Sequence, residues 1–344
     1  MVVCGSEKNI KGCHARLGNT TNAAVSTTWI RRGRLLRTSL NSLSEQYFII
    51  SNTMPYVAEP WSFDDVLKLT KVSSAYWRAT FNAPPLNLFT PRTYAALRTL
   101  VEILENDRAV KVVVFDSSVE DYFIAHWDLL AGEDKTDDEE TTPVFDWANF
   151  VLRLARLPVV SIAEVRGRTR GHGSEFVLAC DMRFGSVEKA IFAQPEAAAG
   201  VHCGGGGIEW LPRLVNRSRA LEILLGGEDF DATTAAQYGY INRAIKDSEL
   251  SAFVDNFARR LAGFDRKPLL ETKRAVNDRA GLPRLTDLLA SMQDFVRSCT
   301  WPETMKRMKT LFEMGIQQDG PVEREMGRHL HEASITMYGK TEDA

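Results

Sequence analysis

The sequence lacks any long apolar run, which argues against a membrane-spanning helix, since such a helix needs roughly 20 consecutive apolar residues. The net charge of its 344 residues is only −3, so the protein also lacks the basic excess typical of proteins that bind nucleic acid or membrane surfaces. No apolar segment follows the first basic residues, which argues against a secretory signal peptide. The remaining composition is that of a globular protein long enough to bury a full core.

Paired cysteines are also lacking. The five cysteines form no Cys-x-x-Cys pair and no even framework, which favours a reducing compartment and a protein that is not secreted. They are Cys4, Cys13, Cys180, Cys203 and Cys299.

Residues 1–55 have little apolar periodicity and are predicted to be a leader. Residues 1–53 hold seven Lys or Arg but only two acids, Glu7 and Glu45. The mixed basic and apolar patch from Thr28 to Arg37 is compatible with a mitochondrial transit segment. A disordered leader, or a start at Met54, is the alternative, with a cytoplasmic protein as the result. The last residues, Thr-Glu-Asp-Ala, are not a peroxisomal signal.

The stretch from Val159 to Leu214 holds the most informative pattern. A short apolar run ends at Val165 and is followed by a glycine-rich break, a short helical segment and a predicted strand from Met182 to Ser186. A second glycine cluster follows at residues 204–207. Glycines at strand-to-helix junctions let the backbone approach a ligand and aim its N–H groups. Two carboxylates, Glu175 and Glu196, lie one in each half of this stretch.

These motifs resemble those of the crotonase (enoyl-CoA hydratase/isomerase) superfamily. The matching residues are Val165-x-Gly167-x-x-x-Gly171-x-Gly173-x-Glu175, Ala179-Cys180-Asp181-x-Arg183, Gln194-Pro195-Glu196-x-x-x-Gly200 and Gly204-x-Gly206-Gly207. The resemblance runs from about Tyr76 to Asn277. It implies an α/β fold, a crotonase-like spiral of ββα units in residues 56–265, followed by a C-terminal helical oligomerisation region in residues 266–344.

Local signals predict the surrounding elements. Thr90 caps a helix that begins at Pro91 and runs to about Asn106. Asp231 caps another, which stops at Gly239. Further strands are expected at 72–81 and 110–116, and helices at 145–156, 218–225, 249–263, 268–280, 285–314 and 323–331. The proline-rich loop 82–87 resembles the family loop that encloses coenzyme A, and the acidic run 133–142 is expected to be a mobile, solvated loop.

The resemblance implies that the protein hydrates a 2-enoyl-CoA thioester. Glu175 would activate the water, and Glu196 would protonate the α carbon or share that water. The main-chain N–H groups of Trp127 and His172 would form an oxyanion hole. Contacts with the substrate and its CoA moiety are implied for Ala125, Asp128, Leu129, Gly171, Gly173 and Gly204. The CoA thioester is the substrate, and no cofactor, metal, nucleic acid or membrane is expected. The resemblance implies a homotrimer or a dimer of trimers.

The sequence departs from the family at several site positions. His126 and His172 stand where the family has glycines, Trp127 is unusually bulky, and Cys203 replaces a proline. Three histidines in such segments could in principle bind a metal, but the spacing of His126, His172 and His202 favours pocket lining. The alternatives that remain open are an isomerase or other CoA-thioester enolate chemistry, and a non-catalytic crotonase-fold protein that binds a partner or RNA.

Overall fold

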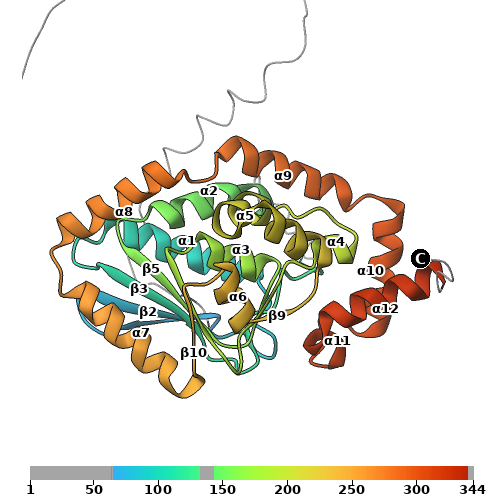
Figure 1. The fold of residues 1–344 in the computed structure, drawn as a ribbon, viewed down its shortest axis with the longest axis horizontal. Coiled ribbons are helices and arrows are strands. Elements are labelled where there is room, and N and C mark those ends of the chain that lie inside the picture. The colour runs from blue at the N-terminus through green and yellow to red at the C-terminus, as the bar shows by residue number, and fades with distance from the viewer. Residues whose placement is uncertain (1–62, 64, 132–142, 340–344) are drawn as a thin grey trace, which may run out of the picture. The chain divides into compact units, whose positions relative to one another are not determined.

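Two β-sheets organise the protein in the computed structural model, which describes residues 63, 65–131 and 143–339 (Figure 1). The larger sheet has the order β1-β2-β3-β5-β7-β10 and the smaller one the order β4-β6-β8-β9. The larger sheet comprises β1 (Leu67–Lys71), β2 (Tyr76–Phe81), β3 (Val112–Ser117), β5 (Val160–Val165), β7 (Met182–Ser186) and β10 (Arg243–Ile245). The smaller sheet comprises β4 (Tyr122–Ile124), β6 (Arg168–Arg170), β8 (Ile191–Ala193) and β9 (Phe230–Asp231). The predicted leader and the whole acidic run 133–142 lie outside the described residues.

Consecutive strands alternate between the two sheets. Each of the pairs β3–β4, β5–β6 and β7–β8 gives one strand to the larger sheet and one to the smaller, and a helix follows each pair. These helices are α2 (Pro143–Arg156), α3 (His172–Ala179) and α4 (Glu196–Ala199). Within each sheet these strands pair in parallel. The alternation is the spiral of ββα units that the resemblance implies.

The central strands β3 and β5 of the larger sheet are buried on both faces. Alternate side chains along each strand point to opposite layers. Val112 and Val114 of β3 pack with Leu250 and Val254 of α7 (Asp247–Ala262). Val113 belongs instead to the main core, which the sheet shares with α1 (Pro91–Asn106), α2 and α3. Parallel strands covered on both faces consist of near-continuous apolar runs, which is why Val160–Val165 is recognisable in the sequence.

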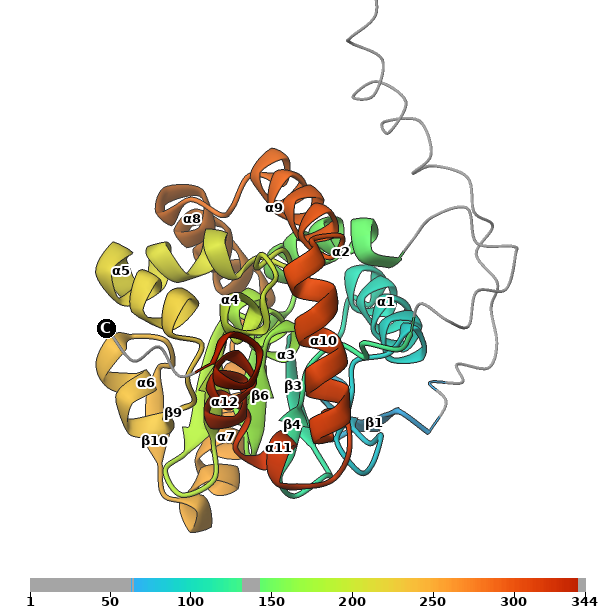
Figure 2. The same ribbon diagram turned by 90° about the vertical axis from the view of Figure 1, so that its right-hand side faces the viewer.

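Among the described residues, seven further helices besides α7 begin within or after the second glycine cluster. They are α5 (Gly207–Gly226), α6 (Ala232–Tyr238), α8 (Arg266–Ala280), α9 (Leu285–Ser298), α10 (Pro302–Met314), α11 (Pro321–Arg324) and α12 (Met326–Tyr338). Leu311 of α10 and Leu330 of α12 share a small apolar core, onto which Ala198 of α4 packs (Figure 2). The C-terminal helices therefore lie against the element that carries Glu196.

Several sequence predictions are confirmed. Helix α1 begins and ends as expected, and the Thr90 hydroxyl accepts a hydrogen bond from the Thr93 N–H. The carboxylate of Asp231 caps α6, which ends at Gly239 with a φ of 85°. Strand β7 matches its predicted bounds.

In the described part of the protein, no helix is both long and apolar enough to cross a membrane.

Other predicted bounds are wrong for local reasons. The strand expected at 72–81 begins only at Tyr76, because residues 72–75 turn the backbone back from β1, with the Ser73 hydroxyl accepting the Tyr76 N–H. The glycine-rich break contains a three-residue strand, β6, whose short length left no periodicity to detect. The helix expected at 218–225 is the second half of α5, which is kinked at Asn216 (φ 71°). The domain boundary at 265/266 stays a prediction.

Candidate active site

Three parallel strands end at one edge of the smaller sheet, and each leads into a predicted site segment. Strand β4 is followed by Trp127, β6 by Gly171 and α3, and β8 by Glu196. Parallel strands bring their carboxyl ends to the same edge, so residues far apart in sequence converge there. The Gly171 N–H donates to the Ala193 carbonyl at 3.0 Å, which extends the β6–β8 pairing up to α3.

Helix α3 holds Glu175 in a buried position. The whole helix is buried except for its first residue, and Glu175 is only 2% exposed. Arg183, from the Ala-Cys-Asp-x-Arg motif, donates to the Val177 carbonyl at 3.1 Å and to the Cys180 carbonyl at 2.8 Å. These carbonyls lie at the end of α3, where the helix itself offers no donors. Arg183 thus fixes the C-terminus of the helix that presents Glu175.

The second glycine cluster encloses the Glu175 carboxylate. Its Oε1 accepts hydrogen bonds from the Gly205 N–H at 2.8 Å and the Gly207 N–H at 3.3 Å. A Cβ on Gly205 would lie 1.9 Å from Oε2 of the same carboxylate, so this position tolerates no side chain without displacing Glu175. The glycine here is required by close approach to a carboxylate.

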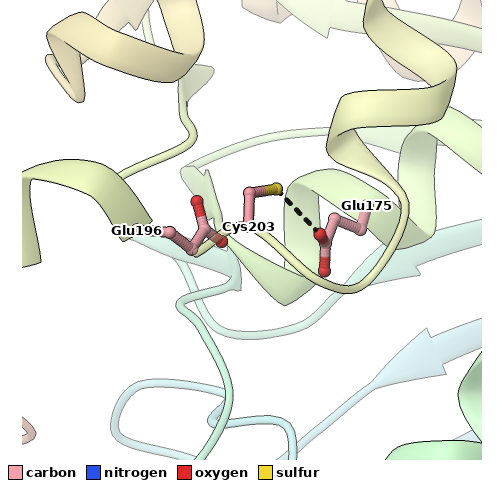
Figure 3. A group of neighbouring side chains, drawn as sticks. All are labelled: Glu175, Glu196 and Cys203. Atoms are coloured by element: carbon pink, nitrogen blue, oxygen red, sulfur yellow. Dashed lines mark hydrogen bonds between the residues drawn. The ribbon is translucent and has the colours of Figure 1, made fainter. Parts of the chain in front are cut away.

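Glu196 and Cys203 complete a compact group with Glu175 (Figure 3). One polar atom from each of the three side chains lies within 4.8 Å of the others. Cys203 lies between the two glutamates, and its thiol donates to Glu175 Oε1 at 3.3 Å. Burial, and then the two carboxylates, raise the pKa of Cys203 well above its usual value, so the thiol stays protonated. In the described residues this is the one group of three or more His, Cys, Asp or Glu side chains spaced closely enough to hold a metal.

The two glutamates have different surroundings. Glu175 accepts two main-chain N–H bonds from the second glycine cluster, whereas Glu196 accepts longer hydrogen bonds from the Gln194 side-chain amide, at 3.3 Å and 3.4 Å. Burial, followed by the charge of Glu175, raises the pKa of Glu196 to about 8, although its side chain is not fully shielded from solvent. At neutral pH Glu196 is therefore mostly a neutral acid beside a second carboxyl group, as suits a proton donor paired with a base.

The raised pKa of Glu196 makes folding stability depend on pH. Between pH 4.5 and about 8 the unfolded state loses this proton while the folded state keeps it, so the stabilisation present at low pH is lost as the pH rises. A Glu196→Gln variant cannot ionise. We expect the Tm of the variant, relative to the Tm of the parent, to increase across this window in thermal unfolding. Glu102→Gln, at an exposed position of α1, should show a constant difference; a constant difference for Glu196→Gln as well would contradict the assigned shift.

Trp127 and His172 present main-chain N–H groups at the same edge. Trp127 forms an isolated β-bridge with Phe89. In this bridge the Asp128 N–H donates to the Phe89 carbonyl and the Phe89 N–H donates to the His126 carbonyl, so the Trp127 N–H takes no part. His172 is the first residue of α3, where no intrahelical acceptor exists. Neither N–H donates a hydrogen bond within the described part of the protein.

The His172 ring lies in an aromatic cluster. Its centroid is 3.8 Å from that of Trp147, 4.6 Å from Phe89 and 5.1 Å from Trp127. Its Nδ1 lies 3.4 Å from Glu175 Oε2, while its buried Nε2 has no hydrogen-bond partner. Side chains thus occupy the space beside the two N–H groups that a glycine at 172 would leave open.

A pocket of about 490 Å³ is lined by Leu88, Thr90 and Asp128, which flank Phe89 and Trp127 in the sequence. The proline-rich loop forms one wall, with Thr90, Asp128 and Gln317 among the other lining residues. Of the six residues expected to contact substrate or its CoA moiety, Asp128 alone lines this pocket. Gly173 and Gly204 are packed closely instead. A Cβ on Gly173 would lie 2.4 Å from the Ile124 carbonyl oxygen, and a Cβ on Gly204 would lie 2.5 Å from the Phe295 Cβ. Ala125 is fully buried, Leu129 is exposed, and Gly171 lies against Glu196.

The structure adds residues to the site that the sequence did not single out for a role. Gln194 links Cys203 and Glu196 through its amide, and the Trp147 indole donates to the Gly205 carbonyl at 2.9 Å. The position of Gln194 beside the Pro195-Glu196 motif was a usable signal. Trp147 gave none, because an aromatic residue on an amphipathic helix is ordinarily a core residue. His126 and His202 do not join His172: His126 bonds to Glu323 at 3.0 Å.

Comparison with known proteins gives consistent matches. The family model for "Enoyl-CoA hydratase/isomerase" matches residues 73–314. A crystal structure of "a putative enoyl-CoA hydratase from Streptomyces avermitilis" is 38% identical, covers 78% of this chain and 96% of its own, and has a TM-score of 0.71. This confirms the expected fold class.

Two curated relatives are similar in sequence. The Arabidopsis thaliana protein named "Probable enoyl-CoA hydratase 2, mitochondrial" is 29% identical over 224 residues, which are 64% of this chain and 74% of the relative. The Mus musculus "Enoyl-CoA hydratase domain-containing protein 2, mitochondrial" is 32% identical over 163 residues, 47% of this chain and 53% of the relative. The match to the mouse protein thus spans about half of that protein.

Proposed function

Because the chain belongs to the enoyl-CoA hydratase/isomerase family, we propose that it adds water to the double bond of a 2-enoyl-CoA thioester. The observation that carries the proposal is the pairing of Glu175 and Glu196 within 4.8 Å, one held by main-chain donors and the other with a raised pKa. Loss of either carboxylate would have favoured an isomerase, a hydrolase or an inactive relative.

The proposed reaction divides the work between the two glutamates. Glu175 takes a proton from water as the water oxygen bonds to the β carbon, and the double-bond electrons move toward the thioester oxygen. Glu196 gives its proton to the α carbon, so one water molecule is added in total. The Trp127 and His172 N–H groups stabilise the transient enolate oxygen, each by roughly 3 kcal/mol by analogy with other oxyanion holes. Water addition oxidises nothing and proceeds without a metal or redox cofactor.

The 490 Å³ pocket is the proposed site of the CoA moiety, since it adjoins the proline-rich loop and Asp128 beside Trp127. The aromatic cluster around His172 supports a short acyl group, because it fills space next to the proposed oxyanion hole. The test is to follow the loss of conjugated-thioester absorbance with a short and a medium-length 2-enoyl-CoA. We expect hydration of both, with a higher kcat/KM for the short one.

The same assay separates the alternatives. Conversion of a 3-enoyl-CoA to the 2-enoyl isomer without hydration would replace the proposal by isomerase chemistry. Failure to bind any acyl-CoA, in a folded protein, would favour a non-catalytic binding role instead.

Two further proposals concern the whole protein. We propose a mitochondrial location, since both curated relatives carry that word in their names and residues 1–53 are rich in basic residues. A fluorescent protein carrying these residues should reach mitochondria, and a diffuse signal would count against it. We propose a homotrimer or dimer of trimers from the family resemblance, which a monomer in analytical ultracentrifugation would contradict.

A further inference from the structure

A short C-terminal segment, residues 317–324, contacts residues that flank both N–H donors of the proposed oxyanion hole, Trp127 and His172. The two N–H donors follow separate strands, so the contacts around them determine their position relative to each other. Misplacement of such groups by about 1 Å can cost on the order of 100-fold in rate. Contacts from this segment to residues next to each donor can therefore affect the reaction rate.

The first contact reaches the Trp127 half. Glu323 is fully buried, and its Oε1 lies 3.0 Å from Nε2 of His126. Nδ1 of the same imidazole donates to the Trp127 carbonyl at 2.6 Å. The His126 ring thus bridges the Glu323 carboxylate and Trp127, the residue whose N–H forms one half of the hole.

Glu323 is itself fixed in place. Its Oε1 also accepts the Gln317 N–H at 2.6 Å, and the Gln317 side chain donates to Asp128 Oδ1 at 2.9 Å and accepts the Leu129 N–H. Burial favours the neutral acid, but the hydrogen bond and the charge of His126, with the Gln317 N–H, outweigh it and lower the pKa of Glu323. The Glu323 carboxylate is thus held in an enclosed position beside the His126 ring.

The second contact reaches the His172 half. The Glu323 main-chain carbonyl accepts from Arg170 Nη1 at 2.5 Å, and the next carbonyl, of Arg324, accepts from Nη2 at 3.2 Å. Arg170 is fully buried and also forms two 2.6 Å hydrogen bonds to Asp229. It ends β6 and is followed directly by Gly171 and His172.

We propose that Glu323 is a positioning residue for the oxyanion hole, acting on Trp127 through His126 and anchored to the His172 half through Arg170. The inference rests on the proposed function, since it assumes that these two N–H groups receive the thioester oxygen. It assigns to the C-terminal helical region a direct part in the geometry of the active site.

The test measures polarisation of the thioester directly. A saturated acyl-CoA carrying ¹³C at the thioester carbonyl cannot be hydrated, and its carbonyl stretch in isotope-edited infrared spectra falls in frequency when an oxyanion hole binds it. We expect a clear fall with the parent protein and loss of most of it with Glu323→Gln, which keeps the shape but removes the charge. Glu325→Gln, at an exposed glutamate two residues away, should behave as the parent does.

Kinetics supply the second readout. In Glu323→Gln we expect kcat for hydration to fall by about 10- to 100-fold with a smaller change in KM, since Glu323 does not line the pocket proposed for the CoA moiety. His126→Ala combined with Glu323→Ala should cost no more than the larger single change, because the two residues act through each other. If the Ala variants do not fold, as thermal unfolding would show, Glu323→Gln decides alone.

The possible failures are distinguishable. No frequency change in the parent would refute the oxyanion hole of the proposed function. A frequency change in the parent that Glu323→Gln retains in full would overturn the role of Glu323 and leave the hole intact.

Discussion

Glu175→Gln is expected to slow hydration of a 2-enoyl-CoA by ~10²–10⁴-fold, the range typical of a lost general acid or base. The amide keeps an oxygen to accept the Gly205 N–H, so the helix and the second glycine cluster should stay in place while the basicity is lost. Glu196→Gln should cause a loss in the same range, because it removes the proton meant for the α carbon. Initial rates of absorbance loss, at saturating substrate, provide the measurement.

A matched control exists in the same region. Glu209 of α5 is also buried and also has a raised pKa, caused first by burial, but its carboxylate bonds to Ser291 outside the pair. Glu209→Gln should therefore leave kcat close to that of the parent. The double variant of Glu175 and Glu196 should lose little more than the worse single one, since groups that act as a unit are not additive. Near-normal hydration by either single variant would refute the two-carboxylate mechanism.

Gly205→Ala is expected to abolish most of the activity while the fold is retained. The added methyl would sit 1.9 Å from Oε2 and 2.5 Å from Cδ of Glu175, which forces the carboxylate away from its position. The obstacle is the end of a side chain and not backbone, so the structure can yield locally without unfolding. A displacement of about 1 Å suffices for a loss on the order of 100-fold in kcat.

Gly226→Ala is the control for this change. Gly226 ends α5, and a Cβ there would meet no atom within 4 Å. Its kinetics should match those of the parent, and circular dichroism should report folded protein for both variants. Gly173→Ala offers a contrast, since its methyl would lie 2.4 Å from the Ile124 carbonyl oxygen, a backbone atom, and should lower the Tm. Full activity in Gly205→Ala would show that Glu175 need not occupy this position.

The parts of the fold that local chemistry specifies were predictable. The caps at Thr90 and Asp231 rest on hydrogen bonds within a few residues, and the strands β5 and β7 leave a pattern that a few consecutive residues display. The structure confirms all four. The motifs also identified the family. Strand β6 and the kink at Asn216 were missed because three residues carry no period and because a kink depends on neighbouring elements.

The sequence by itself determined the family, the succession of strands and helices, and the two glutamates as candidates. Only the tertiary structure decided how those glutamates differ. The glycine cluster gives Glu175 two N–H donors, whereas burial and the charge of Glu175 raise the pKa of Glu196. It also decided which distant residues share the site, among them Trp147, Gln194 and Glu323. The reason is physical, since a pKa and a contact across 197 positions depend on burial and proximity, which exist only once the strands have paired.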